Sequence, residues 1–380
     1  MNLAPQPSPG DPVESIDTPA LVIDLDAMNC NLQTMEAFAR ERQVRLRPHA
    51  KMHKCAAIAR LQRDAGAVGV CVQKTSEAEA LAAAGVDDLY ISNEVIDPAK
   101  LARVAALAAR VRLAIAVDSV EGIERLAAAV AAAGSTIEVF VEIDVGHGRC
   151  GAPAAAAGQL AQCVVSHAPP EGGLRFTGLK AYQGAAQHLR GAAEREAASQ
   201  HAASLARAAQ ASIGAAGIHC PLVTGAGTGT FAFDVVSGVW GELQAGSYLF
   251  MDRDYADNAA AAGAPRFEHA LFLKSRVMSR GAGHAVIDAG HKSHAIDSGL
   301  PRVWQRELVY GNGGDEHGIL RPPPGASAAS LPALGATVWL VPGHCDPTVN
   351  LHDRYVAVRG GLSDGVVAAV WQIEARGCVS

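Results

Sequence analysis

Three potential metal ligands stand side by side near the end of the chain, in the stretch "VPGHCDPTVNLHD" (341–353): His344, Cys345 and Asp346. A thiolate ligand would favour a closed zinc site, whereas a carboxylate would suit a harder metal in a more open site. Pro347 disfavours a helical backbone at Asp346 and favours an extended one. Since residues two apart in an extended segment project to the same side, we predict that His344 and Asp346 converge and that Cys345 points away.

Two protein ligands would leave coordination positions open for water and substrate, as a catalytic metal site requires. An imidazole with a carboxylate suits manganese, cobalt, magnesium or zinc. Manganese is the metal we expect, although the residues themselves do not choose among the four. The alternative is a turn capped by Asp346, with an incidental histidine at position 344.

A lysine that could act as an amine nucleophile lies in "VRLRPHAKMHK" (44–54). If this segment is a strand, alternate residues share a face, which places His49 and Lys51 on the inward side. A desolvated lysine beside other cations has a lowered pKa and can form an imine with a carbonyl group. Lys54 follows the strand and is the weaker candidate. Both lysines could also be solvated residues at a strand end.

Two glycine-containing turns could bind an anion: "VTGAGTGT" (223–230) and "AGSY" (245–248). Glycines allow close backbone approach, and successive backbone N–H groups together with hydroxyls form an anion cradle. By themselves such turns are weak evidence, because ordinary tight turns look the same. A lysine combined with a phosphate cradle indicates pyridoxal phosphate, whose aldehyde needs an amine and whose phosphate needs an anchor.

The elements that must position these residues form a repeated pattern, in which short apolar runs alternate with alanine-rich helical stretches. Nine runs of strand type are predicted at 20–26, 44–50, 69–73, 88–92, 113–118, 137–144, 176–182, 220–225 and 241–248. Strands separated by helix-length segments imply parallel β/α units. Roughly eight such units in about 240 residues match a (β/α)8 barrel. An open, doubly wound sheet is the alternative, because periodicity does not distinguish it from a closed barrel.

Beyond residue 262 the chain changes to β-rich runs joined by Gly, Pro and Asp turns, which predicts a separate all-β domain. We therefore divide the chain into three parts. Residues 1–18 form an N-terminal segment expected to pack on the β-domain, 19–262 form the barrel, and 263–380 form the β-domain with the metal motif. The boundary is soft, because "DNAAAAGAPR" (257–266) could belong to either side.

Composition and charge exclude several classes of protein. The chain is 49% hydrophobic and 18% charged with a net charge of -6, which allows a large core and gives no electrostatic footprint for nucleic acid. No apolar run reaches the roughly 18 residues of a membrane span, and the N-terminus lacks the pattern of a signal peptide. Eight cysteines without repeated spacing predict free thiols in a reducing cytosol. We therefore expect a cytoplasmic protein without nucleic-acid or membrane partners.

Seven motifs occur in a fixed order along the chain: "RPHAKMHK", "EIDVGHGRCG", "AYQGAAQH", "TGAGTGT", "LQAGSY", "DEHG" and "PGHCDPTVNLHD". In this order they resemble the motifs of the D-threonine aldolases, which have the alanine-racemase-like fold (fold type III of pyridoxal-phosphate enzymes). The resemblance covers nearly the whole chain, from "DTPALVIDLD" (17–26) to the C-terminus. It implies a TIM-like barrel followed by a β-domain, and a homodimer in which the β-domain of one subunit meets the barrel mouth of the other.

The resemblance also implies roles for individual residues. Lys51 would carry the cofactor, Arg149 would approach its phenolic oxygen, Tyr182 would contact it, and His188 would be the catalytic base. The phosphate cradle would comprise Thr224, Gly225, Gly227, Thr228, Ser247 and Tyr248. Two positions depart from the family pattern: Ala226 stands where we expect a glycine, and Gln183 where a histidine often follows the tyrosine.

The implied reaction is a retro-aldol cleavage of D-3-hydroxy-α-amino acids that depends on pyridoxal phosphate and a divalent metal, so that D-threonine gives glycine and acetaldehyde. The alternative enzyme is a D-3-hydroxy amino acid dehydratase of the D-serine or D-threo-3-hydroxyaspartate type; the D-serine dehydratases resemble H-x-C at the metal motif. An amino-acid racemase is disfavoured, because its reaction gives no role to a metal at His344. A non-catalytic pyridoxal-phosphate carrier is disfavoured too, because such proteins resemble the barrel alone and this chain adds a β-domain. Asp315 and His317 of "DEHG" are expected to face the same cleft, without an assigned role.

Overall fold

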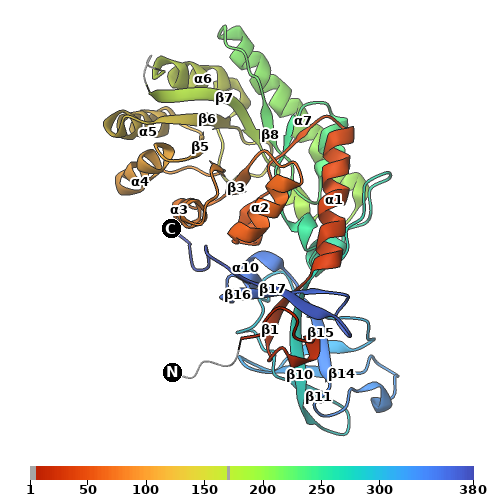
Figure 1. Cartoon of the computed structure of the whole chain (residues 1–380). Coiled ribbons are helices and arrows are strands. Elements are labelled where there is room, and N and C mark those ends of the chain that lie inside the picture. Colours follow the sequence, from red (N-terminus) through yellow and green to blue (C-terminus); the bar gives the residue numbers. More distant parts are fainter. Residues whose placement is uncertain (1–5, 169–171) are drawn as a thin grey trace.

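The computed structural model describes residues 6–168 and 172–380, so the first five residues of the predicted N-terminal segment lie outside the described part. Figure 1 shows two parts: helices surround a set of strands in one, and the other consists mainly of strands. Among the described residues, no helix has the length and apolar character needed to cross a membrane.

The first part is a barrel of eight parallel strands in the order β2-β9-β8-β7-β6-β5-β4-β3. The strands are β2 (Arg45–Leu46), β3 (Val70–Val72), β4 (Asp88–Ile91), β5 (Arg112–Val117), β6 (Thr136–Glu142), β7 (Gly173–Ala181), β8 (Val223–Gly225) and β9 (Glu242–Leu243). Just beyond β2, a parallel bridge joins His49 to Cys71, and the Cys71 N–H donates to the Pro48 carbonyl at 2.8 Å. These contacts join the segment after β2 to β3, the first and last strands in the order, and so close the sheet. The prediction of a barrel is therefore confirmed, and the alternative of an open sheet is wrong.

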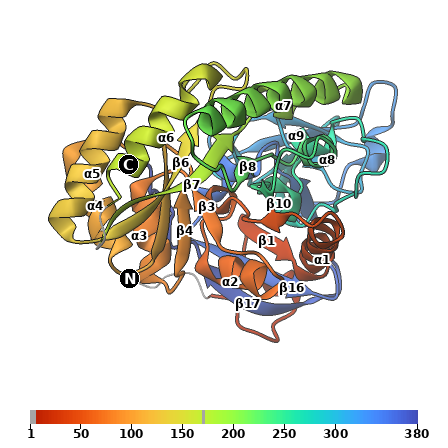
Figure 2. The ribbon, with the colours of Figure 1, turned by 90° about the horizontal axis from the view of Figure 1, so that it is seen from above.

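Helices cover the outside of the barrel, as Figure 2 shows from above. They are α1 (Leu25–Glu41), α2 (Ala56–Asp64), α3 (Thr75–Ala83), α4 (Pro98–Ala108), α5 (Val120–Ala133), α6 (Ala157–Ser166), α7 (Ala192–Ala215) and α8 (Phe231–Val236). The short helix α9 (Arg253–Ala256) follows the last barrel strand and instead contacts the β-domain, where the Arg253 N–H donates to the Pro342 carbonyl at 3.0 Å. Local signals explain several of their ends. Asp97 caps α4 by accepting from the Lys100 N–H, with Pro98 in the first turn, and α5 begins at the Ser119 cap and ends at the left-handed Gly134.

The second part is a β-rich domain built on one nine-stranded sheet, with the short helix α10 (Cys345–Val349) beside it. Its strands are β1 (Ala20–Asp24), β10 (Leu271–Arg280), β11 (Ala285–Ile287), β12 (Arg302–Val303), β13 (Val309–Asn312), β14 (Gly318–Arg321), β15 (Thr337–Val341), β16 (Arg354–Arg359) and β17 (Val366–Gln372). The predicted fold class, a TIM-like barrel followed by a β-domain, is confirmed.

The expectation that the barrel begins at residue 19 is wrong. Strand β1 lies inside the sheet of the β-domain, antiparallel to β10 and parallel to β16, with Val22 opposite Phe272 and Val356. The barrel sheet starts only at Arg45. The run "ALVID" is apolar enough for a buried strand in either sheet, and its local pattern does not say which strands it pairs with.

The described part of the N-terminal segment packs against the β-domain. The buried ammonium group of Lys274, in β10, donates to the carbonyl oxygens of Val13, Glu14 and Ile16 at 2.7–2.9 Å. Val13 and Ile16 also join an apolar cluster with residues of β1, β16 and β17. The segment is therefore held both by an ammonium–carbonyl cage and by apolar contacts.

Candidate active site

A cavity of about 370 Å³ lies where the barrel meets the β-domain. Barrel enzymes carry their reactive groups at the carboxyl ends of the strands, and most of the lining comes from segments that follow barrel strands. Asp346, from the β-domain, completes the wall. The predicted site residues that line the cavity are Lys51, Arg149, Tyr182, Gly227, Thr228, Ser247 and Asp346.

Lys51 is carried by a single 3-10 turn (Ala50–Met52), not by a strand, because β2 ends at Leu46. The His49 side chain caps this turn by accepting from the Lys51 N–H at 3.4 Å. The Lys51 ammonium forms an ion pair with the carboxylate of Asp346. Burial is the largest single influence on Lys51 and lowers its pKa. The charges of Asp346, Tyr182 and Glu77, together with the hydrogen bond to Asp346, outweigh burial, and the net shift is upward. The lowered pKa expected of this lysine is therefore wrong.

Arg149 and Tyr182 form one wall of the cavity. The guanidinium carbon of Arg149 lies 5.9 Å from the centre of the Tyr182 ring, a cation–π arrangement. Arg149 belongs to the loop after β6, where the Asp144 carboxylate accepts backbone N–H groups from Gly146, His147 and Gly148 at 2.9–3.1 Å. This ring of hydrogen bonds fixes the loop that presents Arg149.

The two glycine turns lie next to each other, but only part of the predicted cradle faces the cavity. Gly227, Thr228 and Ser247 line it, and the Thr228 hydroxyl accepts from the Tyr248 N–H at 3.1 Å. A Cβ atom on Gly227 would stand 2.2 Å from Gln187 Oε1, so a side chain at this position would displace the Gln187 amide from its place against the turn.

The other three predicted cradle residues do not line the cavity. The Thr224 hydroxyl is buried and donates to Glu242 at 2.8 Å. Gly225 packs against β7, where an added Cβ atom would come within 2.0 Å of the Ala181 carbonyl oxygen. The Tyr248 ring is directed into the core, with its centre 5.5 Å from that of Phe267. Only the backbone of Tyr248 belongs to the cradle.

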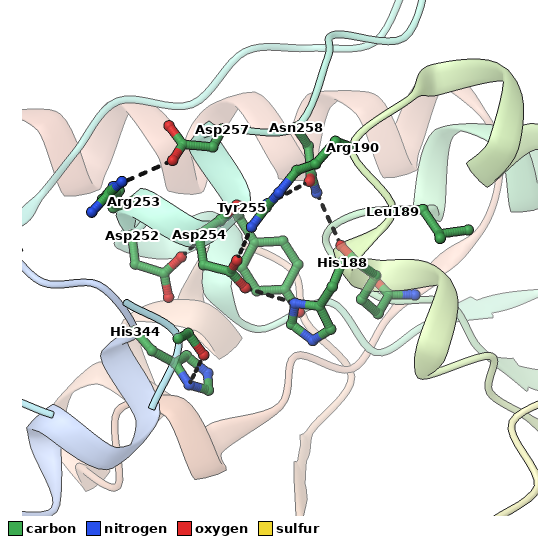
Figure 3. A network of polar contacts seen from close by, with 12 residues as sticks. His188, Leu189, Arg190, Asp252, Arg253, Asp254, Tyr255, Asp257, Asn258 and His344 are labelled. Carbon is green, nitrogen blue, oxygen red and sulfur yellow. Dashed lines mark hydrogen bonds and ion pairs between the residues drawn. The ribbon is translucent and has the colours of Figure 1, made fainter. Parts of the chain in front are cut away.

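His188 lies beside the cavity and not in its lining. It ends a 3-10 turn (Ala185–His188) that follows β7, and its side chain is 50% exposed. Its ring centre is 5.8 Å from that of Tyr255, which does line the cavity. Its Nδ1 atom is 2.6 Å from Asp254 Oδ2, as Figure 3 shows.

His344 and Asp346 converge, as predicted, with His344 Nε2 3.7 Å from Asp346 Oδ1. The reasoning from an extended chain is wrong, however, because Asp346 and Pro347 lie in the first turn of α10 and only His344 is extended. Proline is tolerated there, since an N–H group in the first turn has no partner within the helix.

Cys345 points away from both candidate ligands. It is fully buried, and burial raises the pKa of its thiol well above the ordinary value. Burial also raises the pKa of Asp346, but the charges of Lys51 and His344 prevail and bring it to about 2. The carboxylate is therefore ionised, as a metal ligand must be, and the thiol is not. Within residues 6–168 and 172–380, no group of three or more His, Cys, Asp or Glu side chains is placed so that it could hold a metal ion.

The comparison with known proteins decides the family. Residues 23–254 match the family described as alanine racemase, N-terminal domain, and residues 270–358 match a serine dehydratase domain. A D-threonine aldolase of Arthrobacter sp is 46% identical, covering 99% of this chain and 97% of that protein. The crystal structure of D-threonine aldolase from Filomicrobium marinum superposes with a TM-score of 0.94 at 48% identity, covering 99% of this chain and 100% of that one. The chain belongs to the D-threonine aldolase family.

Two further relatives of this aldolase family member, an aldolase and a dehydratase, differ in their sequence identity to it. A 3-hydroxy-D-aspartate aldolase of Paracoccus denitrificans is 41% identical, covering 97% of this chain and 94% of that protein. A D-threo-3-hydroxyaspartate dehydratase of Delftia sp. is 32% identical, covering 94% of this chain and 97% of that protein. The chain is thus more similar to these aldolases than to the dehydratase.

Two sets of residues in this aldolase family member lie where the sequence did not lead us to expect them. "DEHG" (315–318) does not line the barrel cavity: Asp315 and His317 line a separate hollow of the β-domain, with Asp288 and Lys292. Conversely, Asp254 and Tyr255 stand beside His188, although no role was expected for them. The available signal is the polar run "DRDYADN" (252–258), which begins four residues after the second glycine turn ends.

Proposed function

We propose that this protein is a lyase that cleaves D-3-hydroxy-α-amino acids into glycine and an aldehyde, with pyridoxal phosphate and a divalent metal as cofactors. D-threonine would give glycine and acetaldehyde. The observation that carries the proposal is the meeting of Lys51 and Asp346 in one cavity, although they stand 295 positions apart in the sequence. The greater similarity to aldolases than to a dehydratase supports carbon–carbon cleavage over loss of water.

The residues around the barrel cavity are suited to pyridoxal phosphate. When bound, this cofactor supplies an aldehyde for an amine and an electron sink for the bond that breaks. Lys51 would provide the amine, while Gly227, Thr228 and Ser247 would hold the phosphate through backbone N–H groups and hydroxyls. Arg149 and Tyr182, which line the same cavity, would contact the cofactor. Thr224 and Gly225, which are buried in β8 at the start of the first glycine turn, would hold that turn in place without facing the cavity.

The residues at the domain junction are suited to a divalent metal. Asp346 Oδ1 is buried, and no hydrogen-bond partner for it lies in the described part of the chain. Such an atom carries a desolvation cost unless a ligand satisfies it. His344 and Asp346 would be the ligands, and the bound cation would supply positive charge that lowers the pKa of a hydroxyl group. Manganese is the metal we expect, with cobalt, magnesium or zinc as alternatives.

His188 would accept the proton of the substrate's β-hydroxyl at its Nε2 atom, since Nδ1 is engaged by Asp254. All eight cysteines are free thiols, which agrees with a reducing compartment such as the cytosol. A homodimer, implied by the family resemblance, stays a prediction.

The proposed function is tested by supplying the purified protein with pyridoxal phosphate and Mn²⁺ and offering a panel of D- and L-3-hydroxy amino acids. We expect glycine and an aldehyde from D isomers only. A keto acid with ammonia would support the dehydratase alternative, and no reaction with any D isomer would refute both. Chelation followed by return of single metals identifies the active cation. Comparing D-threonine with D-threo-3-hydroxyaspartate decides between the two substrate types of the aldolase relatives.

A further inference from the structure

The half-exposed ring of His188 contacts the carboxylate of Asp254, as Figure 3 shows. The Asp254 side chain is only 5% exposed, and its Oδ2 atom lies 2.6 Å from His188 Nδ1. An ionised carboxylate can only accept a hydrogen bond, so Nδ1 must carry the proton. The unprotonated nitrogen of the neutral ring is then Nε2.

Arg190 holds Asp254 from the other side. Its guanidinium forms an ion pair with Asp254 Oδ1 and donates to the Asp254 carbonyl oxygen, and it also donates to Asn258 Oδ1 at 2.8 Å. The two carboxylate oxygens therefore have different partners, Arg190 on one and His188 on the other. Arg190 thus fixes the orientation in which the Asp254 carboxylate meets the His188 ring.

The helix that carries Asp254 also holds the candidate metal motif. Asp252 accepts from the Tyr255 N–H at 3.0 Å through one oxygen and from the Cys345 N–H at 2.9 Å through the other. The backbone of α9 adds two more bonds: the N–H groups of residues 253 and 254 donate to the carbonyls of Pro342 and Gly343 at 3.0 and 3.1 Å. One short helix thus joins the loop of His188 to the segment that presents His344.

We propose that Asp254, secured by Arg190, is a positioning residue that fixes the His188 tautomer with its proton on Nδ1 and leaves Nε2 as the proton acceptor. The inference rests on the proposed function, in which His188 acts as the base. Because α9 is bonded to both segments, Asp254 also fixes where that base stands relative to His344 and Asp346. Positioned acid–base groups need both the correct tautomer and the correct location.

The first test is Asp254→Asn. The asparagine amide can donate to Nδ1, which would move the ring proton to Nε2 and block the acceptor. We expect kcat to fall about 10²–10⁴-fold, the usual contribution of a general base, with little change in KM. Asp257→Asn is the matched control: Asp257 lies at the end of the same helix and pairs with Arg253 and Arg302 instead of His188, so its loss should leave kcat close to the parent.

A double-mutant cycle separates positioning from general damage. If Asp254 acts only through His188, Asp254→Asn should cost nothing further in a His188→Ala background. Glycine Cα–H exchange in D₂O reports the cofactor site without involving a β-hydroxyl, so it should persist in Asp254→Asn. Unchanged kcat in Asp254→Asn, or an equal loss in both backgrounds, would overturn the proposal.

A spectroscopic readout keeps this inference separate from the proposed function. In protein labelled with ¹⁵N-histidine, in mildly alkaline buffer, the His188 signals are assigned by their loss in His188→Ala. We expect the shifts of a protonated Nδ1 and an unprotonated Nε2, reversed in Asp254→Asn and unchanged in Asp257→Asn. The opposite tautomer in the parent protein refutes the positioning role. Correct tautomers without glycine release would refute the proposed reaction alone.

Discussion

Lys51 and Asp346 neutralise each other in the cavity, and each shifts the pKa of the other: Asp346 raises that of Lys51, and Lys51 helps to bring that of Asp346 to about 2. Burial opposes both shifts, but the attraction within the pair, together with that of neighbouring charges such as His344, prevails over desolvation. At the residue scale, the site is thus a pair of charges contributed by two parts of the chain. Two predictions concern these residues.

Lys51→Ala should abolish both the visible absorbance of bound pyridoxal phosphate and the release of glycine, because no other group is proposed to supply the amine. Lys74→Ala is the control, since Lys74 lines the same cavity and is exposed. Absorbance spectra after gel filtration and a glycine assay measure both properties. Retention of the cofactor signal in Lys51→Ala would refute the assignment.

Asp346→Ala should weaken metal binding by more than the roughly 10–100-fold typical of an outer-shell partner. Activity should then require a much higher metal concentration. Cys345→Ala should keep the parental metal affinity, because the thiol is buried and protonated. The affinity is measured by titrating metal-depleted protein with Mn²⁺ and monitoring the free ion by electron paramagnetic resonance. Equal losses in the two variants would show that the cysteine, and not the aspartate alone, binds the metal.

At the element scale, the position of the proposed phosphate cradle depends on how closely β8 approaches β7. Gly225 ends β8 under the glycine turn, and the indole N–H of Trp240 donates to the Ala181 carbonyl at 2.9 Å beside it. A side chain at position 225 would meet both partners, 2.0 Å from the Ala181 oxygen and 2.8 Å from the Trp240 nitrogen. The glycine is required here for close approach and not for a left-handed backbone.

Gly225→Ala should therefore lower the free energy of unfolding by about 1–3 kcal/mol, the usual cost of overpacking, and weaken cofactor retention. Gly214→Ala is the matched control: Gly214 lies in α7 with nothing within 4 Å of an added Cβ atom, so alanine should stabilise by about 0.5–1 kcal/mol. Urea unfolding of both variants measures the difference. Parental stability in Gly225→Ala would show that the two strands can move apart without cost.

At the scale of the whole molecule, the barrel and the β-domain share one of their apolar clusters, although each part also has a cluster of its own. Leu21 and Ile23 of β1 belong to an apolar cluster that also contains Leu46 and Leu243 of the barrel strands and Tyr355 of β16. Because β1 is an inner strand of the β-domain sheet and leads directly into α1, neither part can form its complete core alone. We expect the two parts to unfold in a single transition.

Ile23→Ala should destabilise both parts together, by about 2–5 kcal/mol, because the side chain is fully buried at their junction. Hydrogen exchange followed by peptide mass spectrometry should show lost protection in barrel and β-domain strands alike. Val366→Ala, at an exposed edge of β17, should change stability by no more than about 0.5 kcal/mol. Loss of protection confined to the β-domain would refute the shared core.

The sequence alone determined the features that depend on neighbouring residues. Alternating apolar runs and helical stretches predicted the barrel strands, and the ordered motifs identified the family and the cavity residues Lys51, Arg149, Tyr182 and Asp346. These features are local because strand and helix periodicity, and the backbone freedom of glycine, act within a few residues. The convergence of His344 and Asp346 was also correct, although the backbone that produces it is helical.

Only the tertiary structure decided which segments meet. Strand β1 lies in the β-domain, "DEHG" lines a different hollow, and α9 links His188 to the candidate metal motif. An apolar strand pairs wherever its burial and its backbone hydrogen bonds are both satisfied, and its own pattern does not name its partners. The position of Asp254 beside His188 likewise depends on contacts between residues 66 positions apart, which no local periodicity records.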